Sequence, residues 1–317
     1  MFLACGFFPM NSLAYKWVIY TDQQSGDYAE NFVDKVKNMP PFDKFDIEIV
    51  VKVIDPSMLD CSAYDLASRL IKCKTEKIRK DLLESDGDQA MIIKDHDVYQ
   101  GSGGSIPMVT TATPYKTLVH ELCHTFGLAD EYEYSEEEAR TYCKKSIIGS
   151  NVARIKPKES DYKSDTEARK KHRKKIPWYG LIKESTKITH NGEKSLGTAA
   201  KIANLEVSSA RQVAGPSAQK VGLYPAKTCN NYPPKKYKWW QASGEMTMMS
   251  TLGGPFDLGR ANETILFNIL RSRGVPLKSV EGTVHSAENL ESEPRSPKKE
   301  DMDNGRADLS PAGGIEK

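Results

Sequence analysis

The stretch HELCHTFGLAD, residues 120–130, constrains this chain more than any other part of its sequence. His120 and His124 are one helical turn apart, so a helix would project both imidazoles from the same face. Two imidazoles at this spacing can bind one zinc ion. Glu121 lies one residue further round, where its carboxylate can act as a general base toward water without easily reaching the metal. The spacing therefore predicts a helix with two metal ligands and a catalytic carboxylate.

A third ligand is needed, because catalytic zinc sites use three protein ligands and leave one position open. Asp130 is the candidate, but a continuous helix would carry it about 9 Å beyond His124, at about 1.5 Å per residue. Gly127 can adopt the left-handed conformation that ends a helix and turns the chain back. We therefore expect Asp130 to reach the metal from a new direction, giving one zinc ion per chain.

Methionines cluster far downstream, in GEMTMMST (244–251), just before the last expected helix. Zinc peptidases of the metzincin type have a tight turn there, with a methionine that forms an apolar floor beneath the metal. We assign this role to Met249, with Met248 as the alternative. Taken alone, the cluster would be interpreted as core filling, but the HExxHxxGxxD pattern upstream favours the turn.

The apolar pattern predicts that strands and helices alternate along the first half of the chain. We expect strands at 17–20, 45–54, 90–93 and 108–111, and helices at 28–36, 66–83, from 114 onward and at 260–273. Thr113 is the expected N-cap of the motif helix, with Pro114 in its first turn, and Gly274 is expected to end the last helix. This order predicts a mixed α/β (α+β) fold, with a twisted mixed sheet flanked by helices and an irregular C-terminal part.

Charge and hydropathy limit the partners. The 317 residues carry 45 basic and 43 acidic side chains, for a net charge of +2, which gives no general attraction to nucleic acid or anionic membranes. The densest basic stretch, ARKKHRKK (168–175), lacks interleaved aromatic residues, so we interpret it as a solvated surface insertion and not a nucleic-acid site. No apolar run reaches the roughly 18 residues that span a bilayer.

The two ends of the chain differ from its middle. The N-terminus is apolar and ends in small residues, like the tail of a secretory signal, and Leu3–Gly6 resembles a bacterial lipoprotein cleavage site that would anchor Cys5 to lipid. An ordinary first strand with a ragged start fits equally well. From about residue 284 large apolar side chains are almost absent, which predicts a disordered tail. The expected division is an N-terminal segment (1–14), a catalytic domain (15–275, with an upper subdomain 15–127 and a lower subdomain 128–275) and a disordered tail (284–317).

Six cysteines are present, and none forms a CxxC pair of the kind found in zinc ribbons. In an exported protein some of them would form disulfides. Cys61–Cys73 would close a short loop, and Cys143–Cys229 is a second candidate pair. The alternative is that all six are free thiols of a cytoplasmic protein.

Taken together, these motifs resemble the IgA peptidase family of metzincin-like zinc metallopeptidases. The likeness extends over about residues 15–275, and the signature with its DEY ending is highly specific. The segments that carry it are IVVKVIDPS (49–57), HDVYQGSGG (96–104), HELCHTFGLADEY (120–132), NVARI (151–155), IPWYGLI (176–182), VGLY (221–224) and the methionine turn.

The resemblance implies zinc ligands at His120, His124 and Asp130 and a general base at Glu121. It also implies a metzincin-like fold and a hydrolase that cleaves peptide bonds in protein or peptide substrates. Such enzymes are usually exported by bacteria, so we expect a secreted or cell-envelope location. The resemblance does not imply that immunoglobulin is the substrate.

The main alternative is a non-catalytic binding protein, or an inactive peptidase homologue, that uses zinc as a structural clamp. A closed structural site needs a fourth protein ligand, and His96 is the nearest candidate in sequence. Glu121 favours the enzyme, because a structural site does not need it. Two roles are open for Tyr132. It can donate a hydrogen bond to the oxyanion formed during hydrolysis, or it can be a packed aromatic residue that fixes the turn of Asp130.

Overall fold

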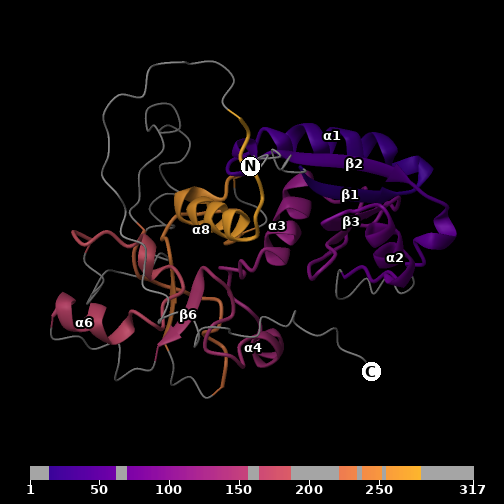
Figure 1. The fold of residues 1–317 in the computed structure, drawn as a ribbon. Coiled ribbons are helices and arrows are strands. Elements are labelled where there is room, and N and C mark those ends of the chain that lie inside the picture. The colour runs from indigo at the N-terminus through magenta and orange to yellow at the C-terminus, as the bar shows by residue number, and fades with distance from the viewer. Residues whose placement is uncertain are drawn as a thin grey trace, which may run out of the picture.

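The computed structural model describes residues 14–61, 70–155, 164–186, 221–233, 238–251 and 255–279. The predictions made for residues 1–13 and for the tail from 284 to 317 lie outside these residues. Figure 1 shows a region built on a five-stranded sheet and a second region built around a smaller sheet.

A mixed sheet organises the first region. In spatial order its strands are β2 (Ile47–Val53), β1 (Tyr15–Thr21), β3 (Gln89–Lys94), β5 (Met108–Thr110) and β4 (Gly101–Ser102). The first four strands are mutually parallel, and β4 pairs antiparallel with β5 at the edge. This is the mixed sheet predicted from the order of elements, with all four expected strands present.

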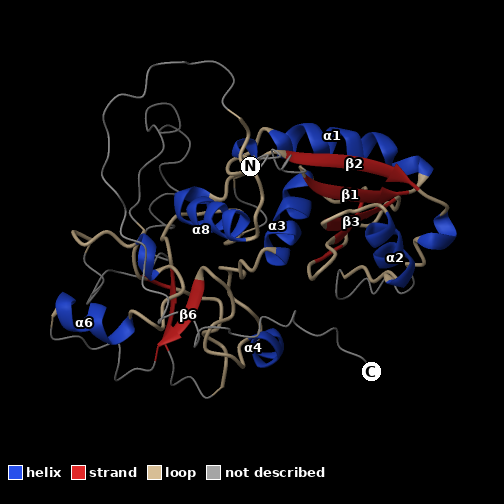
Figure 2. Ribbon diagram, in the orientation of Figure 1, coloured by secondary structure: helices blue, strands red, loops and turns tan. Residues whose placement is uncertain are grey.

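Helices cover both faces of this sheet (Figure 2). They are α1 (Gly26–Lys37), α2 (Glu76–Glu84) and α3 (Tyr115–Thr125). Because successive side chains of a strand point to opposite faces, Trp17 and Ile19 share a core with α1 and α3, whereas Val18 and Tyr20 share a second core with α2. The sheet therefore holds α3 firmly from one side.

The second region contains a three-stranded antiparallel sheet and further helices. The strands, in spatial order, are β6 (Val152–Ile155), β8 (Lys238–Gln241) and β7 (Tyr224–Pro225), and the helices are α4 (Glu136–Tyr142), α6 (Asp165–His172) and α8 (Gly259–Ser272). Short 3-10 turns occur at Gln23–Ser25, Phe42–Lys44, Pro56–Met58 and Tyr179–Leu181. Ile155, Trp240 and Leu266 join the same core as α1 and α3, so the two regions pack on each other through α3 and α8.

Two sequence predictions about helix starts are wrong. The helix expected at 66–83 begins only at Glu76, and residues 70–75 are not helical, because the Cys61–Cys73 disulfide and a hydrogen bond from Lys74 N to Asp60 O tie this segment elsewhere; residues 66–69 lie outside the described part. Thr113 does not cap α3, because the helix begins one residue later than expected, at Tyr115, with Pro114 in the N-cap position. The Thr113 hydroxyl oxygen instead accepts a hydrogen bond from Gln100 N at 3.2 Å. The last helix and its end at Gly274, which has a φ of 81°, match the prediction.

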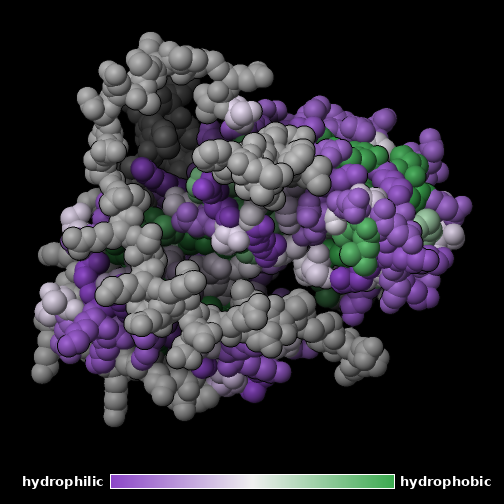
Figure 3. Space-filling view, viewed as in Figure 1, coloured by the Kyte–Doolittle hydropathy of each residue, from purple (hydrophilic) through white to green (hydrophobic). Residues whose placement is uncertain are grey.

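Both expected disulfides form, between Cys61 and Cys73 and between Cys143 and Cys229. The alternative of six free thiols is therefore wrong, and Cys123 is a buried free thiol. Disulfides are typical of proteins in an oxidising compartment. Within the described residues, no helix is both long enough and apolar enough to cross a membrane. The face in Figure 3 is mainly hydrophilic over α1 and α2, and hydrophobic residues show there in small separate areas.

A buried carboxylate closes the end of β1. Asp22 is fully buried and accepts hydrogen bonds from Lys94 Nζ at 2.6 Å, Asp95 N at 3.2 Å and Ser25 N at 3.1 Å. Burial acts to raise the pKa of Asp22, but these donors outweigh it and hold the pKa below its ordinary value. Asp22 therefore stabilises the fold in its charged form.

We predict that Asp22→Asn lowers the free energy of unfolding by about 2 kcal/mol at neutral pH, as expected for lost hydrogen bonds to a charged group. Because the native pKa lies below the unfolded value of about 4, this contribution is present above pH 4 and is lost as the pH falls through the native pKa. Urea unfolding at pH 7 and at low pH measures both effects. Asp34→Asn, at an exposed position of α1, is the control and should change neither.

Candidate metal centre

Helix α3 and the turn after it bring the motif residues together. Leu118, Val119 and Leu122 anchor α3 in the core, which directs the His120 side chain into the interior at 1% exposure. Gly127 has a φ of 87°. As the sequence predicts, the helix ends before it and the chain reverses there.

Hydrogen bonds of the turn hold this reversal. Gly127 N donates to His124 O at 2.9 Å, and Leu128 N donates to Cys123 O at 3.1 Å. Asn151 then binds both backbone groups of Ala129, at 2.7 and 3.0 Å. The next residue is Asp130, whose side chain is thereby returned to the histidine face of α3.

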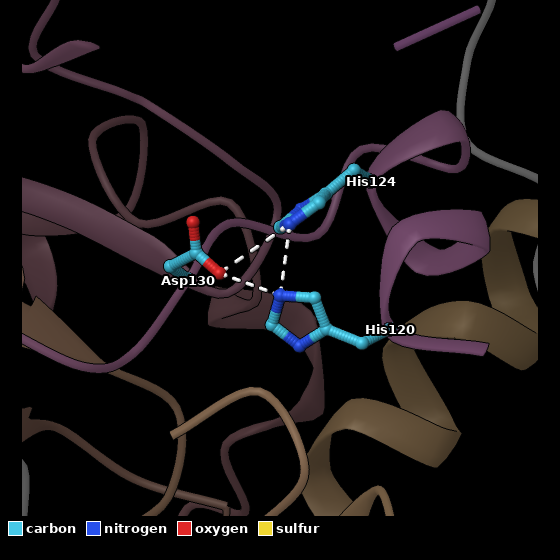
Figure 4. A group of neighbouring side chains, drawn as sticks. All are labelled: His120, His124 and Asp130. Atoms are coloured by element: carbon cyan, nitrogen blue, oxygen red, sulfur yellow. Dashed lines mark hydrogen bonds and ion pairs between the residues drawn. The ribbon is translucent and has the colours of Figure 1, made fainter. Parts of the chain in front are cut away.

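Figure 4 shows three side chains that converge on one point. Asp130 Oδ1 lies 2.8 Å from His120 Nε2 and 3.3 Å from His124 Nε2. The two Nε2 atoms are 3.1 Å apart. These three residues form a group that could hold a metal ion, and all three are the ligands expected from the sequence.

In each imidazole, a hydrogen bond at Nδ1 determines where a ring proton lies. His120 Nδ1 lies 2.9 Å from Met248 O, and His124 Nδ1 lies 2.8 Å from Leu128 O. A carbonyl oxygen can only accept a hydrogen bond, so each Nδ1 must carry the proton. In its neutral form, each ring then presents an unprotonated Nε2 to the meeting point. This is the arrangement that metal-binding histidines ordinarily have.

The three atoms that meet, two imidazole nitrogens and one carboxylate oxygen, are suited to bind a cation. Asp130 Oδ1 is buried and accepts no hydrogen bond of good geometry, although His120 Nε2 is 2.8 Å away. Two ring-nitrogen lone pairs and a carboxylate oxygen thus face one another, and a positive ion is the partner that all three atoms can share. Two nitrogen donors and one oxygen donor suit a borderline divalent metal such as zinc.

The electrostatics of the group favour positive charge. Burial acts to lower the pKa of His124, but Asp130 and Glu121 outweigh it and raise that pKa to about 10. Burial acts to raise the pKa of Asp130, whereas His124 and His120 hold it well below its usual range. Asp130 therefore remains a carboxylate beside the imidazoles.

The second oxygen of Asp130 is already engaged. Tyr134 Oη donates to Asp130 Oδ2 at 2.6 Å, and Thr228 Oγ1 donates to the Asp130 backbone oxygen at 2.9 Å. Only Oδ1 is thus directed at the histidines. Neither residue was singled out from the sequence. Tyr134 follows the motif by four residues, but nothing in the sequence places Thr228 nearby.

Glu121 lies beside the three ligands and is not one of them. It packs against the glycine-rich segment around β4: a Cβ added to Gly103 would stand 2.9 Å from Glu121 Oε2, and one added to Gly101 would stand 3.5 Å from Oε1. Burial raises the pKa of Glu121, and the two histidines oppose this shift. The absence of side chains at these two glycines thus makes room for the Glu121 carboxylate.

The remaining candidates lie near the group with different contacts. The Tyr132 ring stacks on the His120 ring, with centroids 6.3 Å apart; burial raises the Tyr132 pKa, and Asp130 and Glu121 raise it further. Met248 and Met249 are both fully buried, and each offers its backbone oxygen to this region, Met248 O to His120 and Met249 O to Glu131 N at 2.7 Å.

His96, the residue considered as a fourth ligand, is outside the group. Its Nδ1 accepts a hydrogen bond from Val98 N at 3.0 Å. The described residues therefore gather three protein ligands at the site.

In comparisons with known proteins, no family model matches the chain and no curated protein is significantly similar to it.

We predict that Gly127→Ala lowers the free energy of unfolding by about 1–2 kcal/mol, the cost of a left-handed conformation for a residue with a Cβ. An added Cβ would meet only Ser150 Oγ, at 3.7 Å, so the strain lies in the backbone. Metal affinity should fall as well, because this turn delivers Asp130. Calorimetric unfolding and metal titration measure the two effects. Gly26→Ala, in a helix and with open space around it, should not lower either value.

Proposed function

We propose that this protein is a zinc-dependent endopeptidase of the metzincin-like type, similar to the IgA peptidase family. One observation carries the proposal: two imidazoles fixed with Nε2 facing a single carboxylate oxygen, with a second, non-ligating carboxylate beside them. A purely structural site would have no use for that second carboxylate.

His120, His124 and Asp130 would hold the zinc ion. Three protein ligands are typical of catalytic zinc sites, whereas closed structural sites have four. A bound zinc ion would act as a Lewis acid that polarises the scissile carbonyl, and it would lower the pKa of a water molecule at the site to about 7.

Glu121 moves the proton in the proposed reaction. Its carboxylate accepts a proton from the attacking water and then donates it to the leaving amine. The His120-stacked Tyr132 is the proposed donor to the oxyanion; its raised pKa keeps the hydroxyl protonated. Both proposed roles are thus filled by side chains that lie near the His120, His124 and Asp130 group.

A peptide substrate is consistent with the neighbouring strand. Among the described strands, β4 pairs only with β5, and its Gly101 lies against Glu121. An extended peptide can add to such an edge through backbone hydrogen bonds, which would bring its scissile bond to Glu121. We further propose that the enzyme acts outside the bacterial cytoplasm, either secreted or at the cell envelope. The two disulfides support this location.

The first test is metal content. We predict about one zinc ion per chain, and loss of zinc from His124→Ala, because that variant removes one of three ligands. Elemental analysis of protein prepared without chelators measures both. A parent protein that retains far less than one equivalent after incubation with zinc would contradict the proposed centre.

The second test separates an enzyme from a binding protein. Glu121→Gln should keep zinc yet lose about 10²- to 10⁴-fold in peptide cleavage, the usual range for a lost general base. Asp130→Asn should instead lose zinc affinity, because it removes the negative charge of the ligand set. Cleavage of a peptide library, read by mass spectrometry beside zinc analysis, compares the two variants.

Glu133→Gln is the matched control for both, since Glu133 is exposed and near the motif. It should retain zinc and activity. Undiminished cleavage by Glu121→Gln would show that the mechanism is wrong. A zinc-loaded parent that cleaves nothing in a broad library would favour the binding protein.

A further inference from the structure

Glu131 is a buried carboxylate with no part in the proposed chemistry. Its side chain belongs to a residue only 4% exposed. Oε1 accepts hydrogen bonds from Asn151 Nδ2 at 2.9 Å and Asn262 Nδ2 at 3.1 Å. Oε2 accepts one from Thr247 Oγ1 at 3.0 Å. Burying a carboxylate is costly even when it is hydrogen-bonded, so its presence here calls for a reason.

The partners of Glu131 come from separate parts of the chain. Asn151 precedes β6, Asn262 belongs to α8, and Thr247 lies in the methionine-rich turn before α8. The Glu131 backbone N–H adds a fourth bond, to Met249 O at 2.7 Å. One residue therefore joins the loop after α3 to three segments that are distant in sequence.

Through these hydrogen bonds, Glu131 is connected to segments that position two of the three proposed metal ligands, Asp130 and His120. On one side, Glu131 follows Asp130 directly, and its partner Asn151 holds Ala129 just before it. On the other side, Thr247 Oγ1 also accepts Met249 N–H at 3.2 Å, which shapes the turn whose Met248 oxygen orients His120. The Glu131 carboxylate thus connects the loop that carries Asp130 with the turn that orients His120.

We propose that Glu131 is a positioning residue of the metal centre: it locks the Asp130 loop onto the methionine turn, so that Asp130 Oδ1 and His120 Nε2 keep their common focus. The proposal rests on the metal centre proposed above. It does not require that the bound metal cleave peptides.

Thr247→Val is the most direct test, because it removes the hydrogen bond between the Glu131 carboxylate and the turn without changing a ligand. Residues that orient metal ligands typically contribute 10- to 100-fold in metal affinity, so the zinc dissociation constant should rise by about that factor. Glu131→Leu, which removes the acceptor of three hydrogen bonds, should have at least this effect. Competition with a chromophoric chelator, in folded protein at 25 °C, measures the dissociation constants.

Two further variants complete the set. Glu131→Gln is conservative here, since its amide oxygen can accept from both asparagines and its NH₂ group can donate to Thr247 Oγ1, and its zinc affinity should stay near the parental value. Glu133→Leu, at an exposed position of the same loop, should also bind zinc as the parent does.

Cobalt substitution separates positioning from general stability. The visible absorption of bound Co²⁺ reports its coordination geometry, so Thr247→Val should alter the spectrum while far-UV circular dichroism stays unchanged. The proposal is overturned if Thr247→Val and Glu131→Leu both keep the parental zinc affinity and cobalt spectrum, even if they unfold more easily. It is also overturned if the parent binds neither metal. A parent protein that binds metal but cleaves no peptide would contradict the peptidase assignment. The affinity comparisons would still decide the role of Glu131.

Discussion

Two hydrogen bonds from imidazole N–H groups to backbone carbonyls determine what this site can do. They bind the Nδ1 of His120 to Met248 O and that of His124 to Leu128 O. In the neutral form of each ring, the Nε2 lone pair is then directed at Asp130 Oδ1, an arrangement that could hold a cation. If either carbonyl moved, its ring could turn or change tautomer, and the convergence of three donors would be lost.

The fold serves to fix those two carbonyls relative to α3. Leu128 O is set by the left-handed turn at Gly127, which is local. Met248 O is set by the packing of the second region on the first, with Met248 fully buried in the core shared with α3. One support of the proposed metal centre is thus formed by neighbouring residues, and the other depends on the whole tertiary structure. The two regions meet where the ligands gather, so the site depends on their packing.

Local chemistry explains what could be predicted from the sequence. The strands, the reversal at Gly127 and the gathering of His120, His124 and Asp130 follow from short-range spacing and from the freedom of one glycine. The parts that could not be predicted depend on distant partners. Helix α2 begins at Glu76 because a disulfide holds the preceding segment. Thr113 does not cap α3, because Pro114 takes the N-cap position and the Thr113 oxygen accepts from Gln100 N. Glu131 and Tyr134 lie one and four residues after Asp130, but their roles depend on where Asp130 Oδ2, Asn262 and Thr247 come to lie.

X-ray absorption at the zinc edge of the loaded protein tests the central claim most directly. The site predicts two imidazole nitrogens and at least one carboxylate oxygen at about 2.0–2.1 Å, with no sulfur in the first shell. Multiple scattering from the rings identifies the imidazoles and counts them. A sulfur shell near about 2.3 Å, or fewer than two imidazoles, would contradict a centre built from His120, His124 and Asp130.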